Sequence, residues 1–151
     1  LEKKPNIIFG SPALLELIKR NALPSADLSS VTTFISGGDT LSPAKNDEGV
    51  RFFKEHNSNA KIYNGSGSAE TVGANTNAIG QPIKLDTVGR ILTGSECIVI
   101  DADKFNEEGI IEEKKIGEEG LLCIGGDHVF KEYYNMPSKK NQVLKIIISP
   151  V

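Results

Sequence analysis

The stretch AKIYNGSGSAET, residues 60–71, decides the fold of this chain. Residues 60–63 are predicted to form a short strand, which leads into a segment rich in glycine and serine. Gly65 and Gly67 permit backbone conformations and a close approach of a ligand that a side chain would block. Glu70 then places one carboxylate at the far end of this otherwise uncharged loop. A strand that leads into such a loop is predicted to form a ligand cradle.

Two further apolar runs precede this stretch, NIIF at residues 6–9 and TTFI at residues 32–35. Both are predicted to be strands, and the first is bounded as a buried parallel strand would be. The order β-α-β-α-β with short joints favours a parallel sheet with right-handed crossovers. All three strands end in glycine-bearing segments. Because ligands bind beyond the carboxyl ends of strands in open α/β sheets, we expect a site at that edge.

The helices between these strands are indicated by a repeated Ser-Pro dipeptide, Ser11-Pro12 and Ser42-Pro43. In each, serine is suited to cap a helix, and proline suits the first helical position. The first helix is expected to end near Pro24 and the second near His56.

The pattern changes after Thr71. Residues 72–78 fit either another strand or a short helical turn, and residues 80–86 are expected to form a loop. Beyond them the chain shows short strand-like runs with no convincing helix between them, which predicts an antiparallel meander or a small barrel. The three runs are residues 96–100, 109–111 and 121–124.

The expected fold class is therefore α/β, with a parallel β-α-β-α-β half followed by an antiparallel β-rich meander or barrel segment. The α/β segment that carries the candidate loops spans residues 1–78, and the β-rich segment spans residues 79–137. Residues 138–151 form a tail.

Composition and charge exclude several classes of function. The chain is 38% hydrophobic and 25% charged, and its net charge of −3 argues against nucleic acid as the main partner. No apolar segment approaches the roughly 20 residues that cross a bilayer, and no secretory signal opens the chain. Cys97 and Cys123 lie in apolar runs and are expected to be buried free thiols in a reducing cytoplasm. His56 and His128 lie apart from any CxxC pair, so no zinc site is expected.

Four motifs together resemble those of adenylate-forming enzymes, the superfamily of acyl-CoA synthetases, adenylation domains and luciferases. Residues 34–43, FISGGDTLSP, resemble ISGGAPLSP, and residues 64–71, NGSGSAET, resemble N-G-Y-G-x-T-E-T. Residues 87–90, TVGR, are similar to S-V-G-R-P. Residues 117–137 are similar to G-E-x-G-E-L-x-V-x-G followed by V-x-x-G-Y-x-N-x-P. The motifs occur in the family's order over residues 5–137, and the chain is identified as a piece of the large N-terminal domain of an acyl-CoA synthetase.

The resemblance implies ATP-dependent activation of a carboxylic acid. The acid, expected to be a fatty acid, would attack the α-phosphate of ATP to give an acyl-adenylate and pyrophosphate. The acyl group would then pass to coenzyme A. ATP, AMP, Mg²⁺ and coenzyme A are thus the implied cofactors and co-substrates, and the remainder of its own chain is a further partner. By the resemblance, five residues would line the adenine pocket: Gly37, Gly38, Asp39, Asn64 and Gly65.

The resemblance also assigns the residues that follow Gly65. Ser66 occupies the position of the family's tyrosine that packs on adenine, and Ala69 occupies that of the threonine that binds the α-phosphate. Gly67 would border the tunnel for the carboxylate substrate. Glu70 would be the catalytic and metal residue, holding Mg²⁺ against the phosphates as a hard oxygen ligand.

Three functional hypotheses stay open. The leading one is a fragment of an acyl-CoA synthetase, inactive in isolation because the chain shows no Pro-Lys-Gly phosphate loop, T-G-D segment or catalytic lid lysine. The second is an adenylation domain that loads a carrier protein, although the Y-G-P-T-E signature usual for such domains is not seen. The third is a non-catalytic binding or scaffolding module that kept the fold, which Ser66 and Ala69 favour.

Overall fold

Strands and helices alternate through the first part of the chain in the computed structural model, which describes residues 3–80, 84 and 87–136. The chain divides into two compact units. The first unit consists of residues 1–68 and 74–90, and the second consists of residues 69–73 and 91–151. The first unit begins with the predicted β-α-β-α-β order, which is confirmed. Its elements are β1 (Ile7–Gly10), α1 (Pro12–Asn21), β2 (Thr33–Ser36), α2 (Pro43–Glu55) and β3 (Lys61–Ser68).

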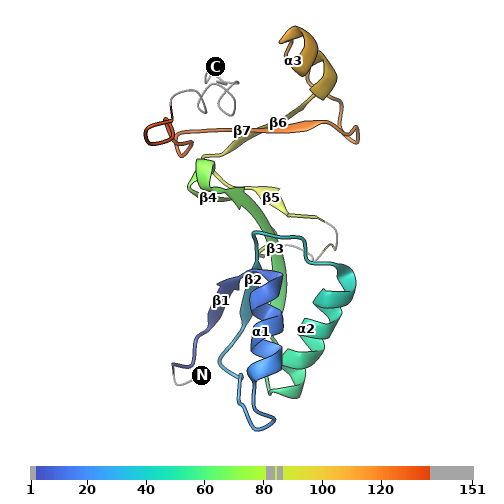
Figure 1. Ribbon diagram of the computed structural model, residues 1–151. Coiled ribbons are helices and arrows are strands. Elements are labelled where there is room, and N and C mark those ends of the chain that lie inside the picture. The colour runs from blue at the N-terminus through green and yellow to red at the C-terminus, as the bar shows by residue number, and fades with distance from the viewer. Residues whose placement is uncertain (1–2, 81–83, 85–86, 137–151) are drawn as a thin grey trace. The chain divides into compact units, whose positions relative to one another are not determined.

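The sheet has the strand order β1-β2-β3-β4-β5, in which β4 is Gly73–Asn77 and β5 is Arg90–Ile91. β1 pairs with β2, and β2 pairs with β3, both in parallel as predicted. Helices α1 and α2 lie side by side over β1–β3 (Figure 1). The core of the unit therefore lies between one face of these strands and the two helices.

Four large side chains of this core are almost completely buried: Leu15, Phe34, Phe53 and Ile62. The Phe34 and Phe53 rings lie 6.2 Å apart between centroids, which joins β2 to α2. Burying a side chain of this size stabilises a fold by about 1.5–3 kcal/mol. Leu15 of α1 and Phe53 of α2 thus hold the two helices against the sheet.

Both Ser-Pro dipeptides begin helices as predicted. The Ser11 hydroxyl accepts a hydrogen bond from the Leu14 amide at 3.3 Å, and the Ser42 hydroxyl accepts one from the Lys45 amide at 3.4 Å. Each cap satisfies one of the amides that the first turn of a helix leaves without an internal partner. α2 ends where expected, with His56 as its C-cap.

The prediction that the first strand is buried is wrong. Ile7 is 61% exposed and Phe9 is 65% exposed. β1 lies at the end of the strand order, and both helices pack on the other face of the sheet, against Ile8. An apolar run therefore forms an edge strand whose outer face has no covering layer in the described part of the chain.

The glycine–serine stretch after Tyr63 is a strand and not the predicted loop, because β3 continues through it. The Ala78 amide donates to the Asn64 carbonyl at 3.1 Å, and the Ser66 amide donates to the Thr76 hydroxyl at 3.2 Å. These bonds keep the stretch extended against β4. Residues 69–71 form a short 3-10 helix, and of the two alternatives for residues 72–78 the strand is the one observed at 73–77.

The second unit contains β6 (Glu96–Ile100), α3 (Ala102–Glu108) and β7 (Leu121–Gly125), with β6 and β7 antiparallel as predicted. Helix α3 was not predicted, and the strand expected at residues 109–111 is absent. In its place, Ile100 and Glu113 form one isolated antiparallel bridge. The expected meander is thus a two-stranded ribbon that carries a helix in its connection.

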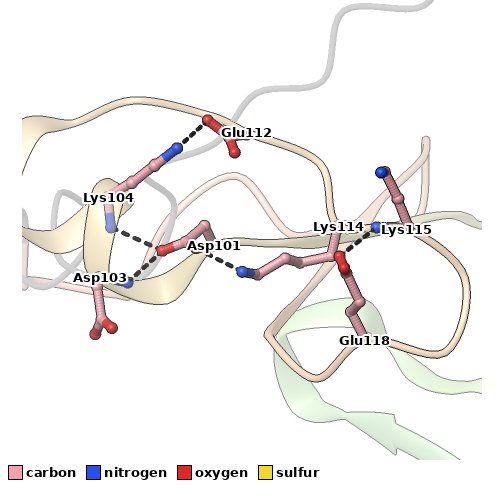
Figure 2. A network of polar contacts seen from close by, with 7 residues as sticks. All are labelled: Asp101, Asp103, Lys104, Glu112, Lys114, Lys115 and Glu118. Carbon is pink, nitrogen blue, oxygen red and sulfur yellow. Dashed lines mark hydrogen bonds and ion pairs between the residues drawn. The ribbon is translucent and has the colours of Figure 1, made fainter.

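A network of polar contacts explains the unpredicted helix (Figure 2). The Asp101 carboxylate caps α3 by accepting hydrogen bonds from the amides of Asp103 and Lys104, at 3.0 and 2.9 Å. Lys114 also donates to the Asp101 carboxylate, at 2.6 Å, and Gly109 ends the helix with a φ of 71°. The Lys114 bond and these amides lower the pKa of Asp101 to about 2. The sequence features that could have indicated this helix are the N-cap residue Asp101 and Gly109, eight residues later, at its C-terminal end.

The two cysteines are free, as predicted, but only Cys123 is buried. The prediction that Cys97 is buried is wrong. In the register of the ribbon, Cys97 lies opposite Ile124 and Cys123 lies opposite Ile98. Because neighbouring residues of a strand point to opposite faces, the two thiols lie on different faces of the ribbon and cannot bond.

Two further predictions concern residues outside the described part of the chain. The expected loop at residues 80–86 is described only at Gly80 and Lys84, and the tail at residues 138–151 lies wholly outside it. Among the residues that the structure does describe, none of the helices has both the length and the apolar character of a membrane span.

Candidate functional site

A hollow of about 490 Å³ opens in the first unit at the carboxyl end of β2, beside the second half of β3. Its volume lies within the range of about 300–1,000 Å³ that is typical of small-molecule sites. Three segments line it, one after β2, one within β3 and one before β5. The lining residues are Gly38, Asp39, Thr40, Leu41, Asn64, Gly65, Ser66, Gly67, Thr87 and Val88.

The parallel register brings the ends of β1 and β2 level with the middle of β3. Gly10, Ser36 and Asn64 are partners across β1, β2 and β3. The Gly37 amide donates to the Gly10 carbonyl at 3.0 Å, and a Cβ on Gly37 would lie 3.6 Å from the Gly65 carbonyl oxygen. The glycines at the ends of β1 and β2 are therefore neighbours of the glycine stretch within β3.

Six of the predicted site residues line the hollow, and Gly37 borders it. Gly38 has a φ of 80°, a left-handed conformation that favours glycine, and a Cβ there would meet no atom within 4 Å. The Asp39 carboxylate is exposed and accepts a hydrogen bond from the Thr40 amide at 2.7 Å. The turn after β2 thus presents main chain and one carboxylate to the space.

Sequence reasoning assigned no role to Thr87 and Val88, which form the third wall. The Asn64 side-chain amide donates to the Thr87 carbonyl at 3.3 Å, so β3 holds this segment in place. Gly89 follows with a φ of 85°, and a Cβ there would lie 2.0 Å from the Asn77 carbonyl oxygen. Only glycine permits this close approach to β4. Gly89 of the TVGR motif, residues 87–90, was therefore the feature of the sequence that could have identified this wall.

Ser36 is the last residue of β2 and directly precedes Gly37 and Gly38 in the chain. Its side chain is 2% exposed, and its hydroxyl has no hydrogen-bond partner among the described residues. A buried hydroxyl without a partner reduces stability by about 1–3 kcal/mol. The residue that ends β2 therefore lowers the stability of the first unit.

The other two predicted residues, Ala69 and Glu70, belong to the second unit, in the 3-10 helix Ala69–Thr71. The Tyr133 hydroxyl donates a hydrogen bond to the Glu70 carboxylate, and the Phe130 amide donates to the Glu70 carbonyl at 2.8 Å. The bond to the Glu70 carboxylate raises the pKa of Tyr133 above its ordinary value. Tyr133 was missed as a partner of Glu70, although both residues lie in quoted motifs.

The described residues contain no group of three or more His, Cys, Asp or Glu side chains that could hold a metal ion. A divalent cation at Glu70 would therefore need oxygen ligands from a substrate. Mg²⁺ is commonly bound in this way, through one or two carboxylates and the phosphates of a nucleotide. The single carboxylate fits an ion that arrives with ATP.

Comparisons with known proteins place these features in a family. The family model described as AMP-binding enzyme matches residues 1–134. A search of the curated proteins finds no match to the sequence.

Among solved structures, the chain is similar to a long-chain-fatty-acid-CoA ligase from Archaeoglobus fulgidus, with 23% identity and a TM-score of 0.75 over 93% of this chain and 28% of that one. It is also similar to the anthranilate CoA ligase AuaEII in complex with anthranoyl-AMP, with 20% identity and a TM-score of 0.73 over 93% and 25% of the two chains. McyG A-PCP complexed with phenylalanyl-adenylate gives 19% identity and a TM-score of 0.74 over 93% and 23%.

These similarities confirm the fold class expected from the sequence, an α/β piece of the N-terminal domain of such enzymes. The chain spans about a quarter of the length of these three structures, since it covers 28%, 25% and 23% of them.

Proposed function

Because the chain belongs to the AMP-binding enzyme family, we propose that the protein that carries it activates a carboxylic acid with ATP and passes the acyl group to coenzyme A. The observation that supports this best is the hollow of the first unit. Three of the four family-like motifs contribute residues to its lining, from Gly38–Leu41, Asn64–Gly67 and Thr87–Val88. Motifs that are far apart in sequence thus share one space of small-molecule size.

In this proposal the hollow binds the adenine of ATP. Its walls combine main-chain donors and acceptors of the glycine segments with the aliphatic side chains of Leu41 and Val88. Such a mixture suits a flat heterocycle with hydrogen-bonding edges, because the main chain gives orientation and the aliphatic groups give contact area. The open space at Gly38 would let the nucleotide approach the backbone.

The reaction begins with the carboxylate oxygen of the acid attacking the α-phosphorus of ATP. The bond from that phosphorus to pyrophosphate breaks, and an acyl-adenylate forms. The thiol of coenzyme A then attacks the acyl carbon, loses its proton, and AMP leaves. Glu70 would hold Mg²⁺, which neutralises phosphate charge when it is bound with ATP. Gly67 would border the path of the acid, for which we propose a fatty acid.

A second candidate function is a non-catalytic module that has kept the fold. Ser66 lines the hollow where the family's tyrosine would pack on adenine, and Ala69 provides no hydroxyl for a phosphate. The loss of one group that stabilises the transition state typically reduces a rate by about 100- to 1,000-fold. The hydroxyl missing at Ala69 would be a loss of this kind, and the ring missing at Ser66 removes a surface for adenine, so this candidate is a binding function without turnover.

Exchange of radiolabelled pyrophosphate into ATP, with a panel of carboxylic acids, tests the proposal in the protein expressed from its complete reading frame. We expect exchange that depends on one class of acid and on Mg²⁺. Adding coenzyme A or a phosphopantetheinylated carrier protein to the same reaction then separates a CoA ligase from a domain that loads a carrier. ATP binding without exchange for any acid would favour the non-catalytic module.

The 151-residue chain by itself is expected to show no exchange, because it spans about a quarter of the length of the similar structures (28%, 25% and 23%). Clear turnover by this chain alone would show that its 151 residues are sufficient for the whole reaction.

A further inference from the structure

Glu70 is joined to a segment 63 residues away in the sequence by two contacts within the second unit. The Tyr133 hydroxyl donates to the carboxylate oxygen Oε1 of Glu70, and the Phe130 amide donates to the Glu70 carbonyl at 2.8 Å. The side chain and the backbone of one residue are thus held by the same short segment.

The segment that provides these contacts is itself braced. The Phe130 and Tyr133 rings meet edge to face, with centroids 4.6 Å apart and planes at 85°. The positive edge of one ring meets the negative face of the other in such a pair, which favours this geometry. The ring of Tyr133 is therefore fixed by packing, and its hydroxyl can hold a carboxylate in one orientation.

We propose that Tyr133 is a positioning residue for Glu70. The Tyr133 hydroxyl holds the Glu70 carboxylate in the orientation in which this carboxylate binds the divalent cation of the nucleotide. The inference rests on the proposed function, because it assumes that Glu70 contacts that cation. Partners that orient a metal ligand in this way typically change metal affinity or activity by about 10- to 100-fold when they are removed.

The neighbouring residue provides a matched control. Tyr134 is 90% exposed, and Tyr134→Phe removes the same hydroxyl one position along the chain. Tyr133→Phe keeps the ring that packs on Phe130 and removes only the donor to Glu70. Glu70→Asp tests the same contact from the other partner, since it keeps the charge but shortens the side chain by one methylene. Far-UV circular dichroism verifies that each variant is folded.

The measurement is the binding of Mn²⁺ with ATP to the protein expressed from its complete reading frame, without an acid substrate. Water-proton relaxation reports it, because Mn²⁺ held on a protein relaxes water protons more strongly than free Mn²⁺–ATP does. We expect Tyr133→Phe and Glu70→Asp to bind about 10- to 100-fold more weakly than the wild type, and Tyr134→Phe to bind like the wild type. In a Glu70→Gln background, Tyr133→Phe should produce no further loss, since its effect acts through the carboxylate.

Two results would overturn the proposal in distinguishable ways. If Glu70→Gln impairs binding but Tyr133→Phe and Tyr134→Phe both match the wild type, Tyr133 does not position Glu70 and the proposed function stands. An equal loss from Tyr133→Phe with and without Glu70→Gln would likewise reduce the tyrosine to a structural role. If Glu70→Gln binds Mn²⁺–ATP as tightly as the wild type, the metal role proposed for Glu70 fails, and the inference fails with it.

Discussion

Replacing Ser36 by alanine is expected to stabilise the protein, which is the opposite of the usual effect of a substitution in a core. The side chain is 2% exposed and its hydroxyl has no partner among the described residues. A buried hydroxyl in this state costs about 1–3 kcal/mol, and alanine removes it at the expense of the packing of one oxygen atom. We therefore expect the free energy of unfolding to rise by about 1 kcal/mol.

Ser58→Ala is a matched control. Ser58 is as buried as Ser36, at 1% exposed, but its hydroxyl both donates and accepts a hydrogen bond. Its hydroxyl donates to the Val31 carbonyl at 2.7 Å and accepts from the Ala60 amide at 3.0 Å. Ser58→Ala leaves both main-chain groups buried without a partner, at about 1–3 kcal/mol each. We expect this variant to lose about 2–6 kcal/mol of stability.

Urea unfolding followed by far-UV circular dichroism measures both variants against the wild type. Ser36→Ala should raise the urea concentration at the unfolding midpoint and Ser58→Ala should lower it, with the slope of the free energy against urea unchanged. If Ser36→Ala lowers stability as Ser58→Ala does, the Ser36 hydroxyl has a partner such as a buried water, and the reasoning is refuted.

Three further predictions follow from local contacts. In Gly49→Ala the new Cβ would lie 2.7 Å from Ile62 Cδ1 and 2.8 Å from Leu15 Cδ2. Overpacking of about 1–3 kcal/mol should exceed the gain in helix propensity of about 1 kcal/mol, so urea unfolding should show a lower free energy of unfolding. Cys97 should react rapidly with a thiol reagent in the folded protein and Cys123 slowly, because burial raises the pKa of the Cys123 thiol; equal rates by mass spectrometry would contradict this. The Asp101 pKa falls from 3.8 to about 2 in the folded state, so its bond with Lys114 stabilises the protein above pH 3.8 and is lost as pH falls toward 2. Asp101→Asn should therefore reduce the pH dependence of the unfolding free energy over that range, and an unchanged slope would argue against the bond.

Local signals predicted the first unit well because they agree with one another. The apolar runs at residues 6–9, 32–35 and 60–63 and the two Ser-Pro caps all indicate the same β-α-β-α-β order, which is observed. When capping, periodicity and turn chemistry favour one structure, the sequence specifies it strongly. The burial of the first strand was mispredicted, because an apolar run does not reveal whether a second layer covers it.

The second unit was predicted less well because its signals depend on contacts distant in the chain. Asp101 acts as a helix cap, but it shares its carboxylate with Lys114, 13 residues away. The runs at residues 96–100 and 121–124 were identified as strands, whereas residues 109–111 have a similar composition and form none. A short apolar run becomes a strand only where a partner strand meets it, and the sequence does not indicate that partner.

At some positions of the candidate site the packing of the backbone permits only glycine, whereas at others it permits different side chains. At Gly65 a Cβ would lie 2.9 Å from the Thr76 carbonyl oxygen, and at Gly89 it would lie 2.0 Å from the Asn77 carbonyl oxygen. Backbone atoms cannot move aside without disturbing β4, so these glycines are fixed by the way in which the segments cross. Ser66 is a residue of β3, and its amide donates a hydrogen bond to the Thr76 hydroxyl of β4 at 3.2 Å. Among the described residues, no hydrogen bond of the Ser66 side chain holds the strand, so we expect this position to affect the proposed nucleotide binding more than the folding of the hollow.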